Sequence, residues 1–148
     1  MKSVVQTVKR GWIKSWDQKG NLISAWAIKK WVVAYVWFCE NDNKDKVDKF
    51  IKKILKLPFF SDSNWKISLS LEDIKWELII VPNFTLCGRN KKGVSLDYSK
   101  ALHFEKSKQL YSYLKDKFEW KPVYFGEFGS YMEIESVIIW PVNLILEI

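Results

Sequence analysis

Apolar and polar residues alternate along several stretches of the chain, a pattern that predicts β-strands with one buried face. Two such stretches cover residues 2–9 and 21–38, and the pair Lys29-Lys30 breaks the second and suits a turn. Further strands are predicted at residues 67–71, 76–81, 122–125, 131–138 and 141–147, with the first two of these joined by a short turn.

Two other stretches carry apolar residues at the spacing of an amphipathic helix. The first covers residues 44–56, with Asp42 or Asn43 as its N-cap, and the second covers residues 104–118. Their apolar faces consist of Val47, Phe50, Ile51, Ile54 and Leu55 in the first, and of Phe104, Ser107, Tyr111, Leu114 and Phe118 in the second.

Predicted strands outnumber predicted helices and are not interleaved with them one for one. This favours an α+β fold, with a mostly antiparallel or mixed β-sheet and two main helices, over a doubly wound fold. No internal repeat, low-complexity tract or linker is visible, so a single domain is predicted over residues 1–148.

The composition adds a possible partner. The 148 residues carry a net charge of +7, and 48% of them are hydrophobic, which excludes a disordered chain. The charge suits an anionic partner such as nucleic acid, but 22 of the 24 cations are Lys, a bias that an AT-rich genome also produces. The six lysines among residues 44–56 leave two interpretations open: a solvated helix face, or a face that approaches RNA phosphates.

The compartment is expected to be the cytoplasm. Cys39 and Cys87 match no metal or redox spacing, so reduced, partly buried thiols are predicted. No signal peptide is visible, and the longest charge-free apolar run, residues 31–39, is too short to cross a bilayer. The pattern therefore predicts a soluble intracellular chain with no membrane partner.

Conventional catalytic residues are scarce. The single histidine, His103, is interpreted as a surface or capping residue, and no Gly-rich phosphate loop, paired-histidine metal motif or serine nucleophile elbow is present. Thr85 and Cys87 follow a buried strand, but a nucleophilic role for either requires a nearby base, and none is obvious. Any catalysis would thus rely on main-chain groups and on the substrate, with no cofactor and no metal.

Five short motifs, in order along the whole chain, resemble signatures of the D-aminoacyl-tRNA deacylases. They are the opening strand at 1–8, Pro-Asn-Phe-Thr-Leu at 82–86 (their Ser-Gln-x-Thr-Leu), Lys-Lys-Gly at 91–93 (their Arg-Lys-Gly), Phe-Gly-Ser-Tyr-Met at 128–132 (their Phe-Gly-Ala-x-Met) and Trp-Pro-Val-Asn at 140–143 (their Gly-Pro-Val-Thr). The resemblance implies that family's barrel-like sheet.

It also implies an activity: hydrolysis of the ester between a D-amino acid, or glycine, and the terminal ribose of tRNA, as translation proofreading by a homodimer. In the family, a cis Gly-Pro peptide reaches into the partner's pocket, and its carbonyls hold the substrate amino group so that an L side chain would clash. Main-chain N–H groups near Phe84 and Thr85 would stabilise the oxyanion, and the RNA 2′-hydroxyl would assist attack.

The implied site residues fall into three groups. The catalytic group is Phe84, Thr85, Trp140 and Pro141; the substrate-binding group is Pro82, Asn83, Phe128, Gly129, Met132, Val142 and Asn143; the tRNA-binding group is Arg89, Lys91 and Lys92.

Several positions depart from the family. Asn83 replaces Gln, Ile138 replaces Asn and Asn143 replaces Thr, while Pro82 replaces Ser and removes a main-chain N–H. Trp140 is the most severe change, because an indole at the family's glycine position would fill the space that the aminoacyl group needs.

Seven of the nine tryptophans fall where the family commonly carries glycine: Trp26, Trp31, Trp37, Trp65, Trp76, Trp120 and Trp140. Glycine and tryptophan are near opposites in size and backbone freedom, so selection rarely exchanges them. UGA and GGA differ by one base, and some genetic codes read UGA as glycine. We therefore hypothesise that these tryptophans are mis-decoded glycines; the alternative is a Trp-rich, diverged pseudoenzyme.

Two rival functions remain at this point. A non-catalytic RNA- or DNA-binding module of the same fold would bind tRNA with strong salt dependence and without turnover. A related deacylase that acts on L-Ala-mischarged tRNA is suggested by Pro82.

Overall fold

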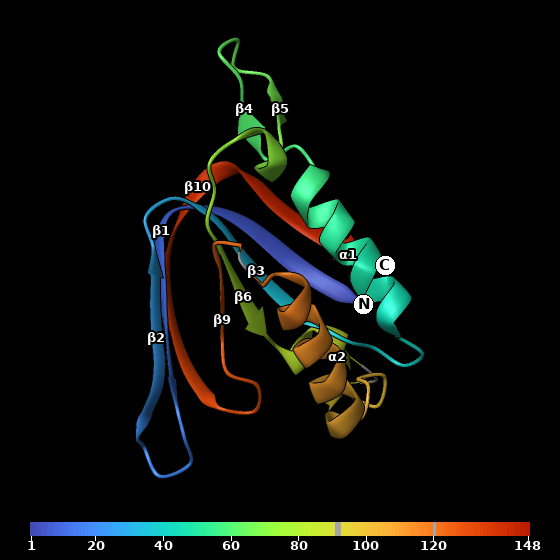
Figure 1. Ribbon diagram of the computed structural model, residues 1–148. Coiled ribbons are helices and arrows are strands. Elements are labelled where there is room, and N and C mark those ends of the chain that lie inside the picture. Colours follow the sequence, from blue (N-terminus) through green and yellow to red (C-terminus); the bar gives the residue numbers. More distant parts are fainter. Residues whose placement is uncertain (91–92, 120) are drawn as a thin grey trace.

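The main sheet is built around one long strand that pairs with three others (Figure 1). The computed structural model describes residues 1–90, 93–119 and 121–148. Strand β1 (Lys2–Trp16) pairs antiparallel with β10 (Tyr131–Glu147) along its length, with β3 (Trp31–Trp37) through its first half and with β2 (Leu22–Ile28) through its second half. Beyond β3, the strands β6 (Leu78–Pro82) and β9 (Val123–Phe125) continue the sheet in parallel.

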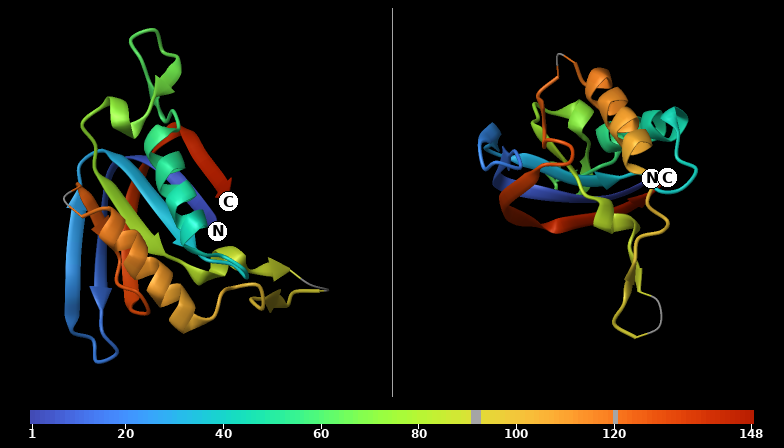
Figure 2. Two further views of the ribbon diagram at one scale, coloured as in Figure 1. Left: turned by 45° about the vertical axis from the view of Figure 1, so that its right-hand side comes forward. Right: turned by 90° about the horizontal axis from the view of Figure 1, so that it is seen from below.

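The order β10-β1-β3-β6-β9, with β2 on β1, makes a mixed six-stranded sheet. Two helices, α1 (Lys44–Lys56) and α2 (Phe104–Lys117), lie against the same face of the sheet (Figures 1 and 2). The predicted α+β class with a barrel-like mixed sheet and two main helices is confirmed.

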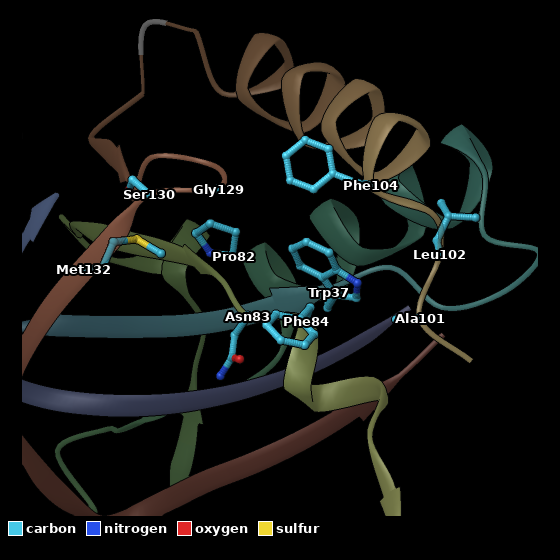
Figure 3. Close-up of a pocket in the computed structure, with 10 residues that line it drawn as sticks. All are labelled: Trp37, Pro82, Asn83, Phe84, Ala101, Leu102, Phe104, Gly129, Ser130 and Met132. Atoms are coloured by element: carbon cyan, nitrogen blue, oxygen red, sulfur yellow. The ribbon is translucent and has the colours of Figure 1, made fainter. Parts of the chain in front are cut away.

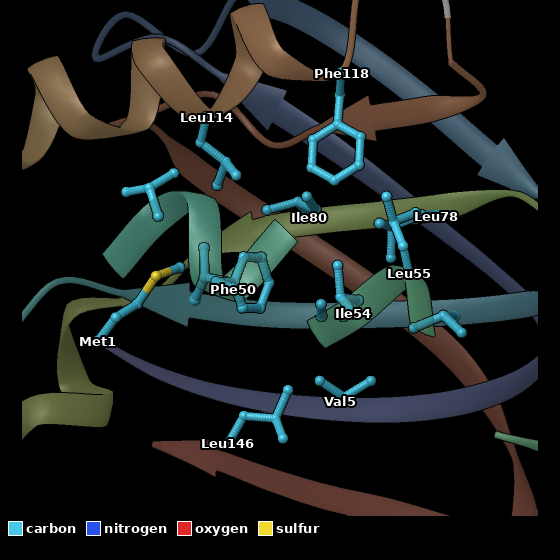
Figure 4. Packing of buried hydrophobic residues seen from close by; sticks show 14 of the residues in the cluster. Met1, Val5, Phe50, Ile54, Leu55, Leu78, Ile80, Leu114, Phe118 and Leu146 are labelled. Carbon is cyan, nitrogen blue, oxygen red and sulfur yellow. The ribbon is translucent and has the colours of Figure 1, made fainter. Parts of the chain in front are cut away.

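The central strands are apolar at every position because both of their faces are covered. In β6, Leu78 and Ile80 join the cluster beneath the helices, while Ile79 and Val81 join a second cluster on the opposite face. Figure 4 shows the larger cluster, where side chains of α1 and α2 meet those of β1, β6 and β10.

Both helices begin where their sequences predict. Asn43 is the N-cap of α1, and its side chain accepts a hydrogen bond from Lys46 N–H at 3.2 Å. His103 occupies the N-cap position of α2 without a side-chain capping bond, in keeping with the surface role expected for it. Phe104, by contrast, was assigned to the apolar face of its helix but is 49% exposed.

Three strand predictions need correction. Residues 2–9 are only part of β1, because β-bulges let the pairing continue to Trp16. Residues 131–138 and 141–147 are one strand, because pairing with β1 resumes after the proline. The segments at 67–71 and 76–81 do not pair with each other: β5 (Ile67–Leu69) pairs with β4 (Phe60–Ser61), and the 3₁₀ helix η1 (Leu71–Asp73) intervenes before β6 enters the sheet.

The expectation of reduced thiols is wrong, since Cys39 and Cys87 form a disulfide with a Cα–Cα distance of 6.0 Å. Cys39 follows β3, and Cys87 ends the 3₁₀ helix η2 (Phe84–Cys87) that follows β6. Because β3 and β6 are parallel neighbours, their carboxyl ends lie side by side, and spacing along the sequence gave no sign of this.

No helix in the described part of the chain combines the length and the apolar character that crossing a membrane requires.

Candidate active site

The segment after β6 makes a tight turn at the carboxyl end of the sheet. The N–H of Asn83 donates to the carbonyl oxygen of Val36 at 2.9 Å, which extends the pairing of β6 with β3. The Asn83 side chain then accepts hydrogen bonds from the Thr85 hydroxyl at 2.6 Å and from the Thr85 N–H at 3.3 Å. Asn83 therefore fixes the first turn of η2, whose early N–H groups have no acceptor within the helix.

A cavity of about 550 Å³, here called the aromatic pocket, opens beside this turn (Figure 3). It is lined by Trp37, Pro82, Asn83, Phe84, Ala101, Leu102, Phe104, Gly129, Ser130 and Met132. The structure thus brings together five predicted site residues from two distant motifs, Pro82, Asn83 and Phe84 from one and Gly129 and Met132 from the other. None of the ten lining residues has a side chain that titrates near neutral pH.

Stacked rings form much of this pocket. Trp37 lies parallel to Phe128, with centroids 5.2 Å apart and an interplanar angle of 10°. Phe104 packs against the same Phe128 at 5.1 Å, and Phe84 meets Trp37 edge-on at 6.1 Å. Phe128 is therefore a supporting residue behind the lining.

A buried tyrosine, Tyr111, packs against Phe128 and the strand ends next to the pocket. The hydroxyl of Tyr111 lies 2.8 Å from the carbonyl oxygen of Gly126 and 3.2 Å from that of Ile80, so it joins the ends of β9 and β6. Its ring packs on Phe128 at 5.6 Å. Burial, and secondarily the charge of Glu127, raises the pKa of Tyr111 well above its ordinary value, so the phenol stays a neutral donor.

Trp140 and Pro141 lie in a different place, at an outward bulge of β10. Gln6 pairs with Asn143 and Val8 pairs with Ile138, so residues 139–142 of β10 face the single residue Thr7 of β1. The Thr7 hydroxyl donates to the carbonyl oxygen of Ile139 at 2.8 Å and lies 3.5 Å from that of Val142.

The peptide bond between Trp140 and Pro141 is cis, and the indole is 83% exposed. Both residues line a second cavity of about 410 Å³, together with Thr7, Trp31 and Trp65 among others, and neither lines the aromatic pocket. Within one chain, Phe84 and the Trp140-Pro141 dipeptide thus line separate cavities, and Thr85 is not among the lining residues of either.

The remaining predicted residues are less central. Val142 packs partly buried against the main core, and Asn143 accepts a hydrogen bond from the Gln6 side chain at 2.9 Å. Arg89 forms an ion pair with Asp97 at 2.8 Å, across a hairpin of β7 (Arg89–Asn90) and β8 (Leu96–Asp97). Lys91 and Lys92 lie outside the described residues.

Four lining residues that lie outside the family motifs were not assigned to the site from the sequence: Trp37, Leu102, Phe104 and Ala101. Trp37 was noted only as a family glycine position, and the other three come from a loop and a helix start whose place beside η2 depends on tertiary contacts. One such contact is the hydrogen bond from Leu102 N–H to the Phe38 carbonyl at 2.9 Å. Ser130, within the Phe-Gly-Ser-Tyr-Met motif, also lines the pocket without having been assigned.

Two of the seven tryptophans at family glycine positions have backbone φ angles that are unfavourable for a large side chain. Three non-glycine residues in the described chain have positive φ, and two of them are Trp31 (136°) and Trp65 (62°); the third, Asn41 (69°), is of a type that tolerates this region. Trp37 is 7% exposed, and its indole N–H has no hydrogen-bond partner among the described residues. Trp120 lies outside the described residues.

Comparison with known proteins gives one consistent result. A family model described as D-Tyr-tRNA(Tyr) deacylase matches residues 4–147. A D-aminoacyl-tRNA deacylase of Thermosipho melanesiensis is 35% identical over 150 aligned residues, which cover 99% of this chain and 97% of the relative. One from Methylacidiphilum infernorum is 34% identical over 149 residues, covering 99% of each chain.

Two solved structures share the fold. The structure titled "c-Myc DNA Unwinding Element Binding Protein" has a TM-score of 0.84 at 29% identity and covers 99% of this chain and 98% of its own. A second, titled as a probable eukaryotic D-amino acid tRNA deacylase, has a TM-score of 0.80 with the same coverage; at 14% identity it supports the fold alone.

Proposed function

The chain belongs to the D-aminoacyl-tRNA deacylase family, hydrolases that act on aminoacyl-tRNA esters, and we propose that it removes D-amino acids or glycine from the 3′ end of tRNA in the cytoplasm. The observation that carries this proposal is the convergence of the 82–84 and 129–132 segments on one pocket that has no titratable side chain. Such a pocket suits a reaction in which main-chain groups and the substrate supply the chemistry.

The aromatic pocket suits the terminal nucleoside of tRNA. Trp37, Phe84 and Phe104 offer flat apolar surfaces, and nucleobases bind aromatic side chains by stacking, with about 1–3 kcal/mol per base. A purine held against these rings would bring the ribose ester to the start of η2.

At that position the ester carbonyl would meet the N–H group of Phe84. It would also meet that of Thr85, which would exchange its long hydrogen bond to the Asn83 side chain, 3.3 Å, for one to the substrate, while the Thr85 hydroxyl stays bonded to Asn83. These donors would stabilise the oxyanion that forms when water attacks the carbonyl carbon. The neighbouring 2′-hydroxyl of the ribose would assist the attack; the carbonyl–O3′ bond then breaks, releasing the amino acid and tRNA. Asn83, which binds Thr85 through its side chain, would hold the turn in position.

Chirality would be read by a second subunit. Trp140-Pro141 and Phe84 lie at separate cavities of one chain, so a site that uses both requires a homodimer. The outward-facing apolar residues of β10, among them Ile138, Trp140 and Ile145, support such an interface, because β10 is an edge strand. Carbonyl groups of the bulge would then hold the substrate amino group and exclude an L side chain.

Trp140 conflicts with this arrangement, since an inserted indole would occupy the aminoacyl space. We propose that glycine is the native residue there and at the six other positions. Positive φ at Trp31 and Trp65 supports this proposal, because glycine adopts such backbone without steric cost while a bulky residue is strained by about 1–3 kcal/mol.

The gene gives a direct test with an internal control. UGA codons are expected at the seven family-glycine positions, and UGG codons at Trp12 and Trp16. UGG at Trp26, Trp31, Trp37 and Trp140 would eliminate the mis-decoding proposal and leave a chain with genuine indoles.

A second candidate function follows if Trp140 is genuine: a nucleic-acid-binding protein without turnover. The exposed indole at the bulge favours it, and the solved structure with a TM-score of 0.84 carries a title that names DNA binding. A third, deacylation of L-Ala-tRNA, is favoured by Pro82, which offers no N–H beside the pocket.

One substrate panel separates the three functions. D-Tyr-tRNA, Gly-tRNA, L-Ala-tRNA and L-Tyr-tRNA are incubated with the chain and with its Trp140→Gly variant, and released amino acid is measured. The Trp140→Gly variant is expected to hydrolyse D-Tyr-tRNA and Gly-tRNA faster than the chain with Trp140, and both proteins are expected to spare L-Tyr-tRNA. Binding of all four tRNAs without release of amino acid would indicate the non-catalytic module. Hydrolysis of L-Ala-tRNA alone would indicate the third function.

A further inference from the structure

The positive charge of this chain is concentrated on its helical layer. Helix α1 carries six Lys and two Asp, and α2 carries four Lys, one Glu and one Asp. The two helices together have a net charge of +6, against +7 for the whole chain. The strands and loops are therefore nearly neutral in sum, and an anionic partner is attracted chiefly to the helices.

Four lysines of α1 form a continuous row. Lys49, Lys52, Lys53 and Lys56 follow the i, i+3, i+4, i+7 spacing, which places them along one side of the helix. They are exposed, on the side turned away from the buried Val47, Phe50 and Ile54. Within the described residues, none of the four has an ion-pair partner.

The acidic residue Asp48 of α1 already has two partners on α2. Asp48 accepts a hydrogen bond from the Tyr113 hydroxyl at 3.0 Å and lies 3.8 Å from Lys117 Nζ on α2. Lys44 and Lys117 both lie over the ring of Tyr113, at 4.9 and 5.0 Å. These contacts join α1 to α2 and leave the charges of the lysine row uncompensated.

The row also has a defined direction relative to the aromatic pocket. Both helices begin beside that pocket: α1 follows Trp37 and Cys39, and α2 begins at Phe104, with Leu102 hydrogen-bonded to Phe38. Both helices run in the same general direction along the sheet, opposite to β3, as Figure 1 shows. The thirteen residues of α1 span about 20 Å at 1.5 Å per residue.

We propose that the lysine row of α1 binds the phosphate backbone of the tRNA acceptor arm while the 3′-terminal adenosine occupies the aromatic pocket. This inference rests on the proposed function for the identity of the RNA. A duplex that carries closely spaced phosphates is the partner that an extended row of unpaired cations fits, and Lys binds phosphate as a point charge without sequence readout.

The test compares two triple variants of equal charge change. Lys49→Gln, Lys52→Gln and Lys56→Gln neutralise three of the row's four lysines. Lys9→Gln, Lys19→Gln and Lys29→Gln neutralise three exposed lysines on or beside the β1–β2 ribbon. Uncharged tRNA is titrated against each by fluorescence anisotropy at several salt concentrations. Because binding is measured without hydrolysis, the result does not depend on catalytic activity.

The row variant is expected to bind tRNA about tenfold or more weakly at low salt, with its log Kd–log salt slope reduced by about 2 to 3. The ribbon variant should retain most of the affinity and slope. A triple Lys→Arg variant of the row should bind like the parent, which excludes a folding defect as the cause. Equal affinity and slope in the row variant and the parent, or equal losses in both Gln variants, would overturn the proposal.

A minimal ester separates this inference from the proposed function. Hydrolysis of 3′-O-(D-tyrosyl)adenosine, which has no acceptor arm, should be the same for the row variant and the parent. If the parent and its Trp140→Gly variant both fail to hydrolyse this ester, the proposed function fails while the binding titration still decides the lysine row. If the row variant loses ester hydrolysis as well, the row acts on the site itself and the docking proposal fails.

Discussion

The hydroxyl of Thr7 donates a hydrogen bond to the carbonyl oxygen of Ile139, 2.8 Å away, and so fixes the bulge of β10 to the first strand. Four residues of β10 face this one residue of β1, and the bulge they form presents Trp140 and Pro141 to the outside. The position of the dipeptide therefore depends on a single side chain from the other end of the sequence.

Replacing Thr7 with Val is expected to loosen the bulge, because Val keeps the shape of Thr without the donor. Stability should fall by about 1 kcal/mol, the usual net value of one hydrogen bond. The deacylation rate should fall more than this loss of stability explains, since the dipeptide would lose its position. Urea unfolding and D-Tyr-tRNA hydrolysis measure the two effects, and Thr7→Ser, which keeps the donor, should preserve both.

Replacing Trp140 with Gly is expected to raise the rate of D-Tyr-tRNA deacylation by tenfold or more (about 1.4 kcal/mol of barrier), because an indole no longer enters the aminoacyl space. Trp65→Gly is the matched control: Trp65 is similarly exposed, at 89%, and lines the same cavity as Trp140, but it belongs to no catalytic motif, so its replacement should leave the rate unchanged. Equally high rates in the parent and in the Trp140→Gly variant would refute steric blocking.

Trp65→Gly should nevertheless stabilise the fold. Its φ of 62° is unfavourable for a large side chain by about 1–2 kcal/mol, and an indole this exposed has little packing to lose. Thermal unfolding is expected to show a gain of about 1 kcal/mol. Trp26→Gly serves as the comparison, because Trp26 lies in β2 with its ring 5.4 Å from Tyr124, and glycine within a strand should destabilise.

Tyr111 predicts a particular pH dependence. Its pKa is raised in the folded protein by burial, so its contribution to stability is complete below the ordinary value of 10.0 and declines as the pH rises above it. The free energy of unfolding should therefore decrease as the pH rises above about 10. Burial also raises the pKa of Tyr35, so both tyrosines contribute to this pH dependence. The fraction of the decrease in unfolding free energy that is absent from the Tyr111→Phe variant is the contribution of Tyr111.

The disulfide should contribute strongly to stability. Cys39 and Cys87 are 48 residues apart, and closing a loop of that length corresponds to about 4 kcal/mol in the chain-entropy model. The double variant Cys39→Ser, Cys87→Ser should lose much of this in urea unfolding. A dithiol reductant should destabilise the parent by a similar amount and leave the double variant unaffected; equal stability of the two would exclude the contribution.

Local patterns predicted much of the fold. The bounds of α1 and the start of α2 follow from capping and helical spacing, and the break at Lys29-Lys30 separates β2 from β3 as expected. Pairing partners were predicted less well, because β5 and β6 look alike in sequence as short apolar runs. Tertiary contacts place β5 in an outer hairpin with β4, and they place β6 in the main sheet beside β3.

The same distinction applies to the site. Residues of the family motifs, such as Phe84 and Met132, were found by resemblance and do line the pocket. Leu102 and Phe104 carry no motif, and their proximity to η2 arises from the loop that returns beside β3. The disulfide escaped prediction for the same reason, since parallel strand ends meet only in three dimensions.

The two anchors of η2 have a consequence for how the enzyme adapts to its substrates. Asn83 is bonded to Val36 at one end of the turn and Cys87 is cross-linked at the other, so this wall is rigid. Adjustment to the stacked nucleobase then falls to Phe104, whose ring is 49% exposed. The fit of the terminal base would thus depend on one aromatic side chain, with the reacting backbone held constant.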